Sequence, residues 1–189
     1  MATTRTFVAV IPSNETRAQA AQLAAELQPF APDIKWVVPT NLHWTLHFLG
    51  DVQNTELPAV CDTVATAVEE FEPFSVTAGG AGAFPSAEKP RTLWLGTTEG
   101  TREFVALQAA VKSSLEQLGF RGENRPYVPH LTLGRAGRRH NTKSMAEQLA
   151  QLAEYPGGST DIDEVRVLGS ELARSGPTYH LIGRASLDG

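Results

Sequence analysis

The stretches His43-Trp44-Thr45-Leu46 and His130-Leu131-Thr132-Leu133 decide how this chain folds. In each stretch polar side chains alternate with large apolar ones, which is typical of a half-buried β-strand. Residues i and i+2 of a strand share a face, so the His and Thr side chains point one way and the apolar side chains point into a core. We therefore predict that two imidazoles and two hydroxyls from distant parts of the chain line one cleft.

Helical and strand patterns alternate around these two motifs. Apolar residues at three- and four-residue spacing predict helices over residues 14–28, 55–71, 101–118 and 142–155. Alternating or β-rich runs predict strands over residues 6–11, 34–38, 42–49, 74–78, 91–95, 127–133, 162–172 and 179–187. The glycine-rich run at 79–82 predicts a bulge. The His-x-Thr element recurs after comparable elements, so we predict an internal duplication and an α+β fold with helices on the outer faces of mainly antiparallel sheets.

Composition narrows the functional classes. The chain has 189 residues, 41% hydrophobic and 20% charged, as in ordinary globular proteins. A formal charge of −5 argues against wrapping a long polyanion. No apolar run has the roughly 18–20 residues that span a bilayer, and the N-terminal apolar run is too short for a signal peptide. We expect a cytoplasmic protein that does not contact membranes.

Two histidines on one face suit acid–base chemistry. Histidine has a reference pKa of about 6.5, so near neutrality one imidazole can accept a proton while the other donates one. Cleavage of a phosphodiester needs both acts, together with donors to the non-bridging oxygens. His43 and His130 are the candidate catalytic residues, and Thr45 and Thr132 are candidate donors.

Other chemistries fit the sequence less well. A metal site is disfavoured because the chain has no His-x-x-x-His on a helix and no Cys-x-x-Cys, and His43 and His47 would lie roughly 13 Å apart on a strand. A serine hydrolase is disfavoured because the chain has no Gly-x-Ser-x-Gly. We predict catalysis without a metal or another cofactor.

The motifs and their flanks resemble those of the two-histidine (2H) phosphoesterase superfamily, most closely the RNA 2′,3′-cyclic phosphodiesterases, also called 2′-5′ RNA ligases. The resemblance covers nearly the whole chain. It rests on the segments 5–12, 36–37, 41–50, 90–96, 125–135, 170–172 and 176–179.

This resemblance implies a bilobal, pseudo-symmetric fold of one domain over residues 1–189, with one His-x-Thr motif from each lobe in a central cleft. It also implies hydrolysis of terminal RNA 2′,3′-cyclic phosphates to 2′-phosphates without a metal, and in some members a reversible 2′-5′ ligation. By the same resemblance, His43 protonates the departing 3′ oxygen and His130 activates water, while Thr45 and Thr132 hold the phosphate.

Further candidate contacts come from the flanks. By resemblance Arg135 adds a cation near the phosphate; its position is one step out of strand phase, so either Gly134 permits a twist or bulge, or Arg135 lies on the rim. Tyr127 and Phe7 are candidates for stacking a base, although Phe7 also fits a core. His47 is in phase with His43 and is interpreted as a rim residue or a substrate contact. The basic run at 138–140 is either a solvated loop or a phosphate-steering patch.

Two alternatives remain open beside the leading interpretation. The motifs specify phosphate chemistry and not the base, so the substrate is either an RNA end or another cyclic or 2′-5′-linked small nucleotide. The chain is otherwise a non-catalytic protein that binds RNA ends. We expect a monomer.

Overall fold

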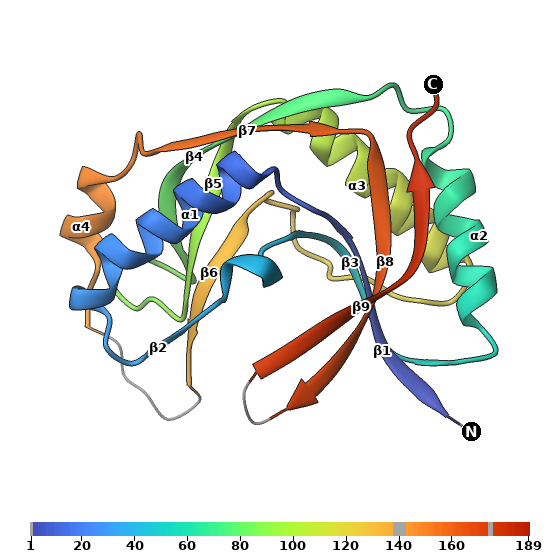
Figure 1. Ribbon diagram of the computed structural model, residues 1–189, viewed down its shortest axis with the longest axis horizontal. Helices are drawn as coiled ribbons and strands as arrows, with labels where there is room; N and C mark the ends of the chain where they lie inside the picture. The colour runs from blue at the N-terminus through green and yellow to red at the C-terminus, as the bar shows by residue number, and fades with distance from the viewer. Residues whose placement is uncertain (1, 138–142, 174–175) are drawn as a thin grey trace.

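The strands form one curled, antiparallel sheet in the computed structural model, which describes residues 2–137, 143–173 and 176–189. The hydrogen-bonded path runs β7-β4-β5-β6-β3-β1-β8-β9, and β2 pairs with β6 (Figure 1). The bounds are β1 (Thr3–Val10), β2 (Ile34–Trp36), β3 (Trp44–Gln53), β4 (Phe74–Phe84), β5 (Thr92–Glu99), β6 (Leu131–Ala136), β7 (Pro156–Ile162), β8 (Glu164–Ala173) and β9 (Gly176–Ser186).

The sheet consists of two halves that meet at the motif strands. One half is β7-β4-β5-β6 and the other is β3-β1-β8-β9. In the described residues β3 and β6 pair at a single position, where Trp44 lies opposite Leu131. The two expected sheets are therefore joined into one at the residues that follow the two motif histidines, and the predicted α+β class is confirmed.

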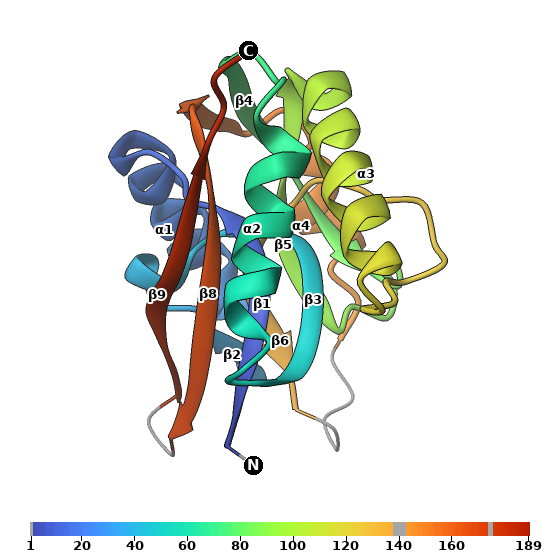
Figure 2. The ribbon, with the colours of Figure 1, turned by 90° about the vertical axis from the view of Figure 1, so that its right-hand side faces the viewer.

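The helices cover the outside of the curled sheet. They are α1 (Asn14–Leu27), α2 (Leu57–Val68), α3 (Thr101–Gln117) and α4 (Ala146–Gln151), with short 3-10 turns η1 (Gln28–Phe30) and η2 (Pro39–Asn41). Figure 2 shows α2 and α3 side by side on one flank, while α1 lies on the opposite side, packed against β7 and β6. Ser13 caps α1 by accepting a hydrogen bond from the Thr16 amide.

The apolar residues of both motifs belong to the main core. Trp44 and Leu131 are fully buried, and Leu46 and Leu133 are nearly so. A second, small cluster of Phe7, Ala9 and Leu168 packs on the opposite face of the sheet, beside Tyr179. The predicted division between the core face and the histidine face of each motif is therefore confirmed.

Matching β-bulges interrupt the two motif strands. Val8 pairs with His47 and Ala9 with Thr45, which leaves Leu46 as the extra residue in β3. Leu93 pairs with Gly134 and Trp94 with Thr132, which leaves Leu133 as the extra residue in β6. Each bulge follows directly after a His-x-Thr element and reverses the facing of the residues directly beyond it, in β3 as far as a second bulge at Leu49.

Several strand ends differ from the prediction. β3 does not stop at Gly50 but continues to Gln53, because Gly50 adopts a φ of 77° that glycine tolerates and the strand goes on pairing with β1. The segment 127–130 is not strand, and β6 begins only at Leu131; Pro129 has no N–H to donate to a ladder.

Two further predictions failed, since the extent of one helix was wrong and one strand was not predicted. Within the described residues, the expected helix over 142–155 extends only over α4, and the backbone N–H of the buried Met145 bonds to the Ala87 carbonyl directly before it. β7 was not predicted as a separate strand, since its sequence is rich in glycine and polar residues. The bulge predicted in the glycine-rich run is present, as a register shift between Ala78 and Ala81.

Candidate active site

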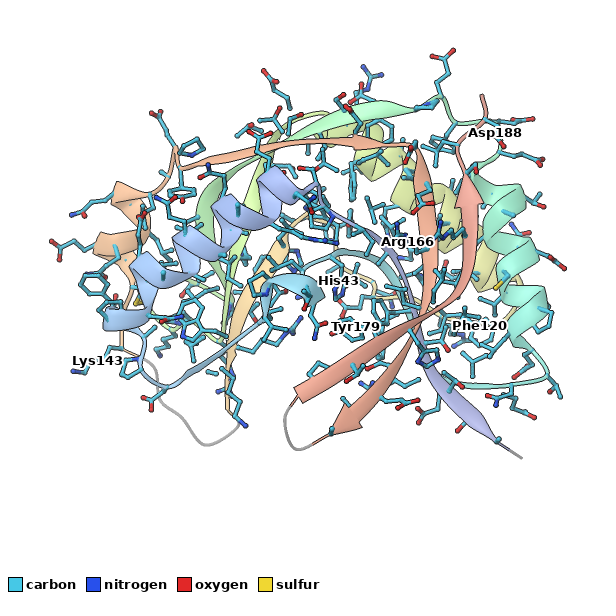
Figure 3. All side chains as sticks on the ribbon, in the orientation of Figure 1. His43, Phe120, Lys143, Arg166, Tyr179 and Asp188 are labelled. Atoms are coloured by element: carbon cyan, nitrogen blue, oxygen red, sulfur yellow. The ribbon has the colours of Figure 1, made fainter. Side chains whose placement is uncertain are left out.

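His43 lies between η2 and the start of β3, and one of its ring nitrogens is already engaged. Its Nδ1 atom lies 2.7 Å from the carbonyl oxygen of Asn41. A carbonyl oxygen can only accept, so Nδ1 carries the proton and donates it. The Nε2 atom is left available to accept or deliver a proton. In Figure 3 the His43 side chain lies beside Tyr179, between η2 and the β8–β9 hairpin.

His130 repeats this arrangement in the other half of the sheet. Its Nδ1 atom donates to the carbonyl oxygen of Val128 over 2.8 Å, again two residues back in the chain. Trp44 faces Leu131 in an antiparallel pair, so His43 lies toward Thr132 and His130 toward Thr45. The two motifs thus meet with two available Nε2 atoms and two hydroxyls around one junction.

Aromatic rings enclose each imidazole. His43 packs on Phe7, with ring centroids 4.8 Å apart, and meets Tyr179 edge-on at 5.2 Å. His130 meets Phe84 edge-on at 5.0 Å and lies 6.3 Å from Trp94. Burial lowers the pKa of both histidines below the usual 6.5, and the charge of Arg135 lowers both further. Both imidazoles are therefore mainly neutral at pH 7.

Arg135 is on the same side of the sheet as the motif residues because of the bulge at Leu133. Its Nη2 atom donates to the Thr132 hydroxyl over 3.3 Å. The guanidinium is also close enough to act electrostatically on His43, His130 and Tyr179. The sequence left two possibilities for Arg135, a twist or bulge at Gly134 or a place on the rim. The structure contains a bulge at Leu133, one residue before Gly134. The exposed Arg135 brings a positive charge to the site.

The two threonines differ in their surroundings. Thr132 accepts from Arg135, whereas the Thr45 hydroxyl bonds to no described residue and its backbone carbonyl accepts from the Tyr127 hydroxyl over 3.0 Å. Both side chains are half-buried. An open hydroxyl and a guanidinium-bonded hydroxyl suit the binding of two oxygens of one anion.

The two aromatic candidates for base stacking differ in exposure, because Phe7 is buried and Tyr127 is half-buried. Phe7 is 3% exposed, beneath His43 and Tyr179. Tyr127 stacks on the core residue Phe104, and burial raises its pKa, so its hydroxyl stays a donor. Phe7 supports His43, and Tyr127 holds the Thr45 backbone. Stacking of a base on Phe7 would require its neighbours to move, and stacking on either ring stays a prediction.

His47 does not lie with His43 and Thr45, contrary to expectation. The bulge at Leu46 turns it to the core side, where it is 3% exposed and its Nε2 atom donates to the Phe120 carbonyl over 3.1 Å. It is therefore a structural residue, neither on the rim nor in contact with the site.

Some neighbours of the histidines were not identified from the sequence. Tyr179, Phe84 and Trp94 come from β9, β4 and β5, and only the fold brings their rings to the imidazoles. Trp94 and Tyr179 stood in the segments that carry the family resemblance, which was the one available signal.

The remaining features that bear on function, a cavity, metal ligands and membrane helices, were compared with this site within the described part of the chain. A cavity of about 500 Å³ lies between α1, β4 and β7, away from the motifs. In the described ranges no three His, Cys, Asp or Glu side chains cluster as metal ligands, and no helix there is long and apolar enough to cross a bilayer. The basic run at 138–140 lies outside the described residues.

Comparison with known proteins decides the family. A family described as "LigT like Phosphoesterase" matches residues 10–94 and again residues 95–179. The chain belongs to this LigT-like phosphoesterase family. Its relatives include an "RNA 2′,3′-cyclic phosphodiesterase" of Methanothermobacter thermautotrophicus, 36% identical over 93% of this chain and 94% of the relative.

Solved structures share the whole fold of the chain. The protein TT0787 of Thermus thermophilus is 26% identical, with a TM-score of 0.80 over 98% of each chain. E. coli LigT complexed with 3′-AMP is 25% identical, with a TM-score of 0.77 over 99% of each chain. The expected α+β class is thereby confirmed over the whole chain, and the E. coli neighbour binds a nucleotide.

Proposed function

We propose that this LigT-like phosphoesterase hydrolyses the 2′,3′-cyclic phosphate at the end of an RNA to a 2′-phosphate, by metal-independent acid–base catalysis with His43 and His130. One observation carries the proposal. Both histidines donate from Nδ1 to the carbonyl two residues back, so two matched Nε2 atoms face one junction beside Arg135. The names of the relatives supply the substrate class.

The reaction needs one proton removed and one delivered. Nε2 of neutral His130 takes a proton from water while the water oxygen bonds to phosphorus. The bond from phosphorus to the 3′ oxygen breaks, and Nε2–H of protonated His43 delivers a proton to that oxygen. The product carries a 2′-phosphate and a 3′-hydroxyl, and the histidines return to their starting states by exchange with solvent. The structure is symmetric in these two groups, so the assignment of acid and base follows the family resemblance.

Substrate charge makes the acid role compatible with the lowered pKa of His43. In the free protein Arg135 disfavours a second positive charge. A bound phosphodiester anion offsets that charge and favours protonation of a neighbouring imidazole. Arg135 and the two threonine hydroxyls would then hold the non-bridging oxygens as charge develops on them.

Hydrolysis of a defined RNA end in EDTA tests the proposal. An oligoribonucleotide with a 2′,3′-cyclic phosphate should give a 2′-phosphate product, identified by ³¹P NMR. His43→Ala and His130→Ala should each reduce kcat by about 10²–10⁴-fold, as for a lost general acid or base. Binding of the RNA end without turnover at any pH between 5 and 9 would favour an end-binding protein instead. Loss of turnover in EDTA would overturn the metal-free mechanism.

Small nucleotides are the competing substrates. The E. coli LigT structures include complexes with 3′-AMP, NADP+ and ATP, so this fold accommodates nucleotides without an RNA chain. A cyclic mononucleotide and a 2′-5′-linked dinucleotide belong in the same assay. Faster turnover of either compound than of the RNA end would assign the chain to the alternative substrate class.

The same two groups would also serve 2′-5′ ligation. If the 5′-hydroxyl of a second RNA replaces water, His130 removes its proton and the product is a 2′-5′ linkage. Incubation of two RNA fragments, one ending in a cyclic phosphate and one beginning with a 5′-hydroxyl, tests this extension. Products of fragment length alone would limit the protein to hydrolysis.

We also propose that residues 1–189 form a single domain of two similar lobes and act as a monomer in the cytoplasm. The repeated bulges and the two successive family matches support the two lobes. Sedimentation equilibrium would test the monomer, and one cooperative unfolding transition would support the single domain.

A further inference from the structure

The hydroxyl of Tyr179 differs from those of the other two tyrosines of the chain, because it has no hydrogen-bond partner among the described residues. Tyr127 donates to the Thr45 carbonyl over 3.0 Å. Tyr155 donates to the Gln19 carbonyl over 3.2 Å. Tyr179 is half-buried, and its oxygen is not sealed from solvent. Tyr179 therefore has a hydrogen-bond donor that the described part of the folded chain leaves unused.

The Tyr179 ring is fixed against two rings of the active site. It meets Phe7 edge-on with centroids 5.0 Å apart, and it meets His43 edge-on with centroids 5.2 Å apart. Figure 3 shows the Tyr179 side chain beside His43, between η2 and the β8–β9 hairpin. A tyrosine hydroxyl lies at the end of a rigid ring, so these contacts also hold the donor at the site.

Arg135 approaches the site from the other half of the sheet. Tyr179 belongs to β9, in the half that contains β3, whereas Arg135 belongs to β6. Burial raises the pKa of Tyr179 above its usual range, and the charge of Arg135 partly opposes that rise. The hydroxyl therefore stays protonated near neutrality and lies within electrostatic reach of the guanidinium.

A protonated hydroxyl at this position can donate to an anion but cannot act as a base. A phosphodiester has two non-bridging oxygens, and each of them can accept more than one hydrogen bond. The donors described so far, Thr45, Thr132 and Arg135, belong to β3 and β6. Tyr179 adds a neutral donor from a third strand, β9, beside one of the two imidazoles.

These observations lead to a further contact with the substrate. We propose that the Tyr179 hydroxyl donates a hydrogen bond to one non-bridging oxygen of the cyclic phosphate, which Arg135 holds from the other half of the sheet; this rests on the proposed function. Hydrogen bonds to charged oxygens are about twice as strong as those between neutral groups. Negative charge grows on the non-bridging oxygens during the reaction, so a donor that is already fixed in the free protein stabilises the transition state.

Removal of the hydroxyl alone tests this contact. Tyr179→Phe keeps the ring and should lower kcat/KM for an oligoribonucleotide with a terminal 2′,3′-cyclic phosphate by about 10- to 150-fold, as for a lost hydrogen bond to a charged group. Tyr155→Phe is the matched control and should preserve kcat/KM, because the Tyr155 hydroxyl bonds to Gln19 beside the cavity away from the motifs. A loss in Tyr179→Leu that is absent in Tyr179→Phe would show that only the ring matters, and would overturn the proposal.

A sulfur substitution separates contact with the substrate from an effect on His43. The terminal cyclic phosphorothioate exists as two diastereomers, which carry sulfur at different non-bridging positions, and sulfur accepts hydrogen bonds more weakly than oxygen. Tyr179→Phe should lower kcat/KM for one diastereomer by the factor seen with the oxygen substrate. It should hardly change kcat/KM for the other diastereomer, in which sulfur has already weakened the bond to Tyr179.

Failure of this contact is distinguishable from failure of the proposed function. If the wild type does not cleave the cyclic phosphate, the proposed function fails. If the wild type cleaves it and Tyr179→Phe keeps the full kcat/KM, the hydroxyl is not a substrate contact. If Tyr179→Phe lowers kcat/KM equally for both diastereomers, Tyr179 acts through the position of His43 and the proposal is wrong.

Discussion

The Nδ1 atom of His43 donates to the backbone carbonyl of Asn41, and the side chain of Asn41 donates in turn to the carbonyl of Pro177 over 2.8 Å. Asn41 therefore ties the β8–β9 hairpin to the residue that orients His43. The same hairpin carries Tyr179, which meets the His43 ring edge-on. The orientation of one imidazole thus depends on a hydrogen bond to a segment distant in the chain.

Removal of the Asn41 side chain should reduce turnover without removing a reacting group. Asn41→Ala keeps the carbonyl that anchors His43 but frees the hairpin, and the loss of one hydrogen bond corresponds to about a 2- to 12-fold lower kcat. Asn54→Ala is a matched control, because Asn54 also makes one long-range side-chain bond at the surface, to Thr4. Equal effects of the two variants on kcat would contradict the positioning role of Asn41.

The pH dependence of kcat/KM should reflect the lowered pKa values. In the proposed mechanism one histidine is neutral and the other protonated, so activity should be lost below the lower and above the higher apparent pKa of the pair. Burial and Arg135 lower both pKa values in the free protein, so the maximum should lie below pH 6.5. Steady-state rates from pH 4.5 to 8.5 check this, and a maximum above pH 7 would show that another group controls the rate.

Arg135→Gln should move the whole profile toward higher pH. A nearby positive charge disfavours the imidazolium, so its removal raises both pKa values and extends activity on the alkaline side. Arg125→Gln should be measured beside it, because the charge of Arg125 lowers the pKa of His130 and does not affect the pKa of His43. In this variant one limb of the pH profile of kcat/KM should move more than the other. Unchanged limbs in both variants would argue against these charges as the cause.

A methyl group at Gly82 should disturb His130 through Trp94. A Cβ atom there would lie 2.2 Å from the indole ring of Trp94, which is next to His130. Gly82→Ala should therefore displace the indole, lower kcat more than it raises KM, and change the tryptophan fluorescence. The combination of Gly82→Ala with Trp94→Ala should be no less active than Trp94→Ala alone; a further additive loss would show that the methyl group acts by another route.

The motif residues could be predicted from the sequence, but the phase of their neighbours could not. Alternation within four residues is local, so it assigned His43, Thr45, His130 and Thr132 to one face. A bulge depends on how a strand pairs with a partner far along the chain, β1 for Leu46 and β5 for Leu133. For this reason the sequence placed His47 on the wrong face of the sheet and could not decide on which face Arg135 lies.

Strand limits failed for a related reason. The segment over 127–130 has the alternation of a strand, but Pro129 cannot donate to a ladder. β7 has little apolar pattern, and it is a strand because it pairs along the edge of β4. Local pattern predicted where apolar faces lie, whereas pairing partners decided where strands begin and end.

His47 should matter for stability and not for turnover. His47→Ala removes a buried ring and leaves the Phe120 carbonyl without its donor, which costs about 1–3 kcal/mol in the free energy of unfolding. Burial lowers its pKa below 6.5, so the unfolded chain binds the proton more tightly. The stabilisation is present above pH 6.5 and is lost as the pH falls through the lowered pKa of the folded state. Urea unfolding of both proteins between pH 5 and 8 should show their stabilities converging toward low pH; a constant difference, or a large loss of kcat, would contradict the structural role.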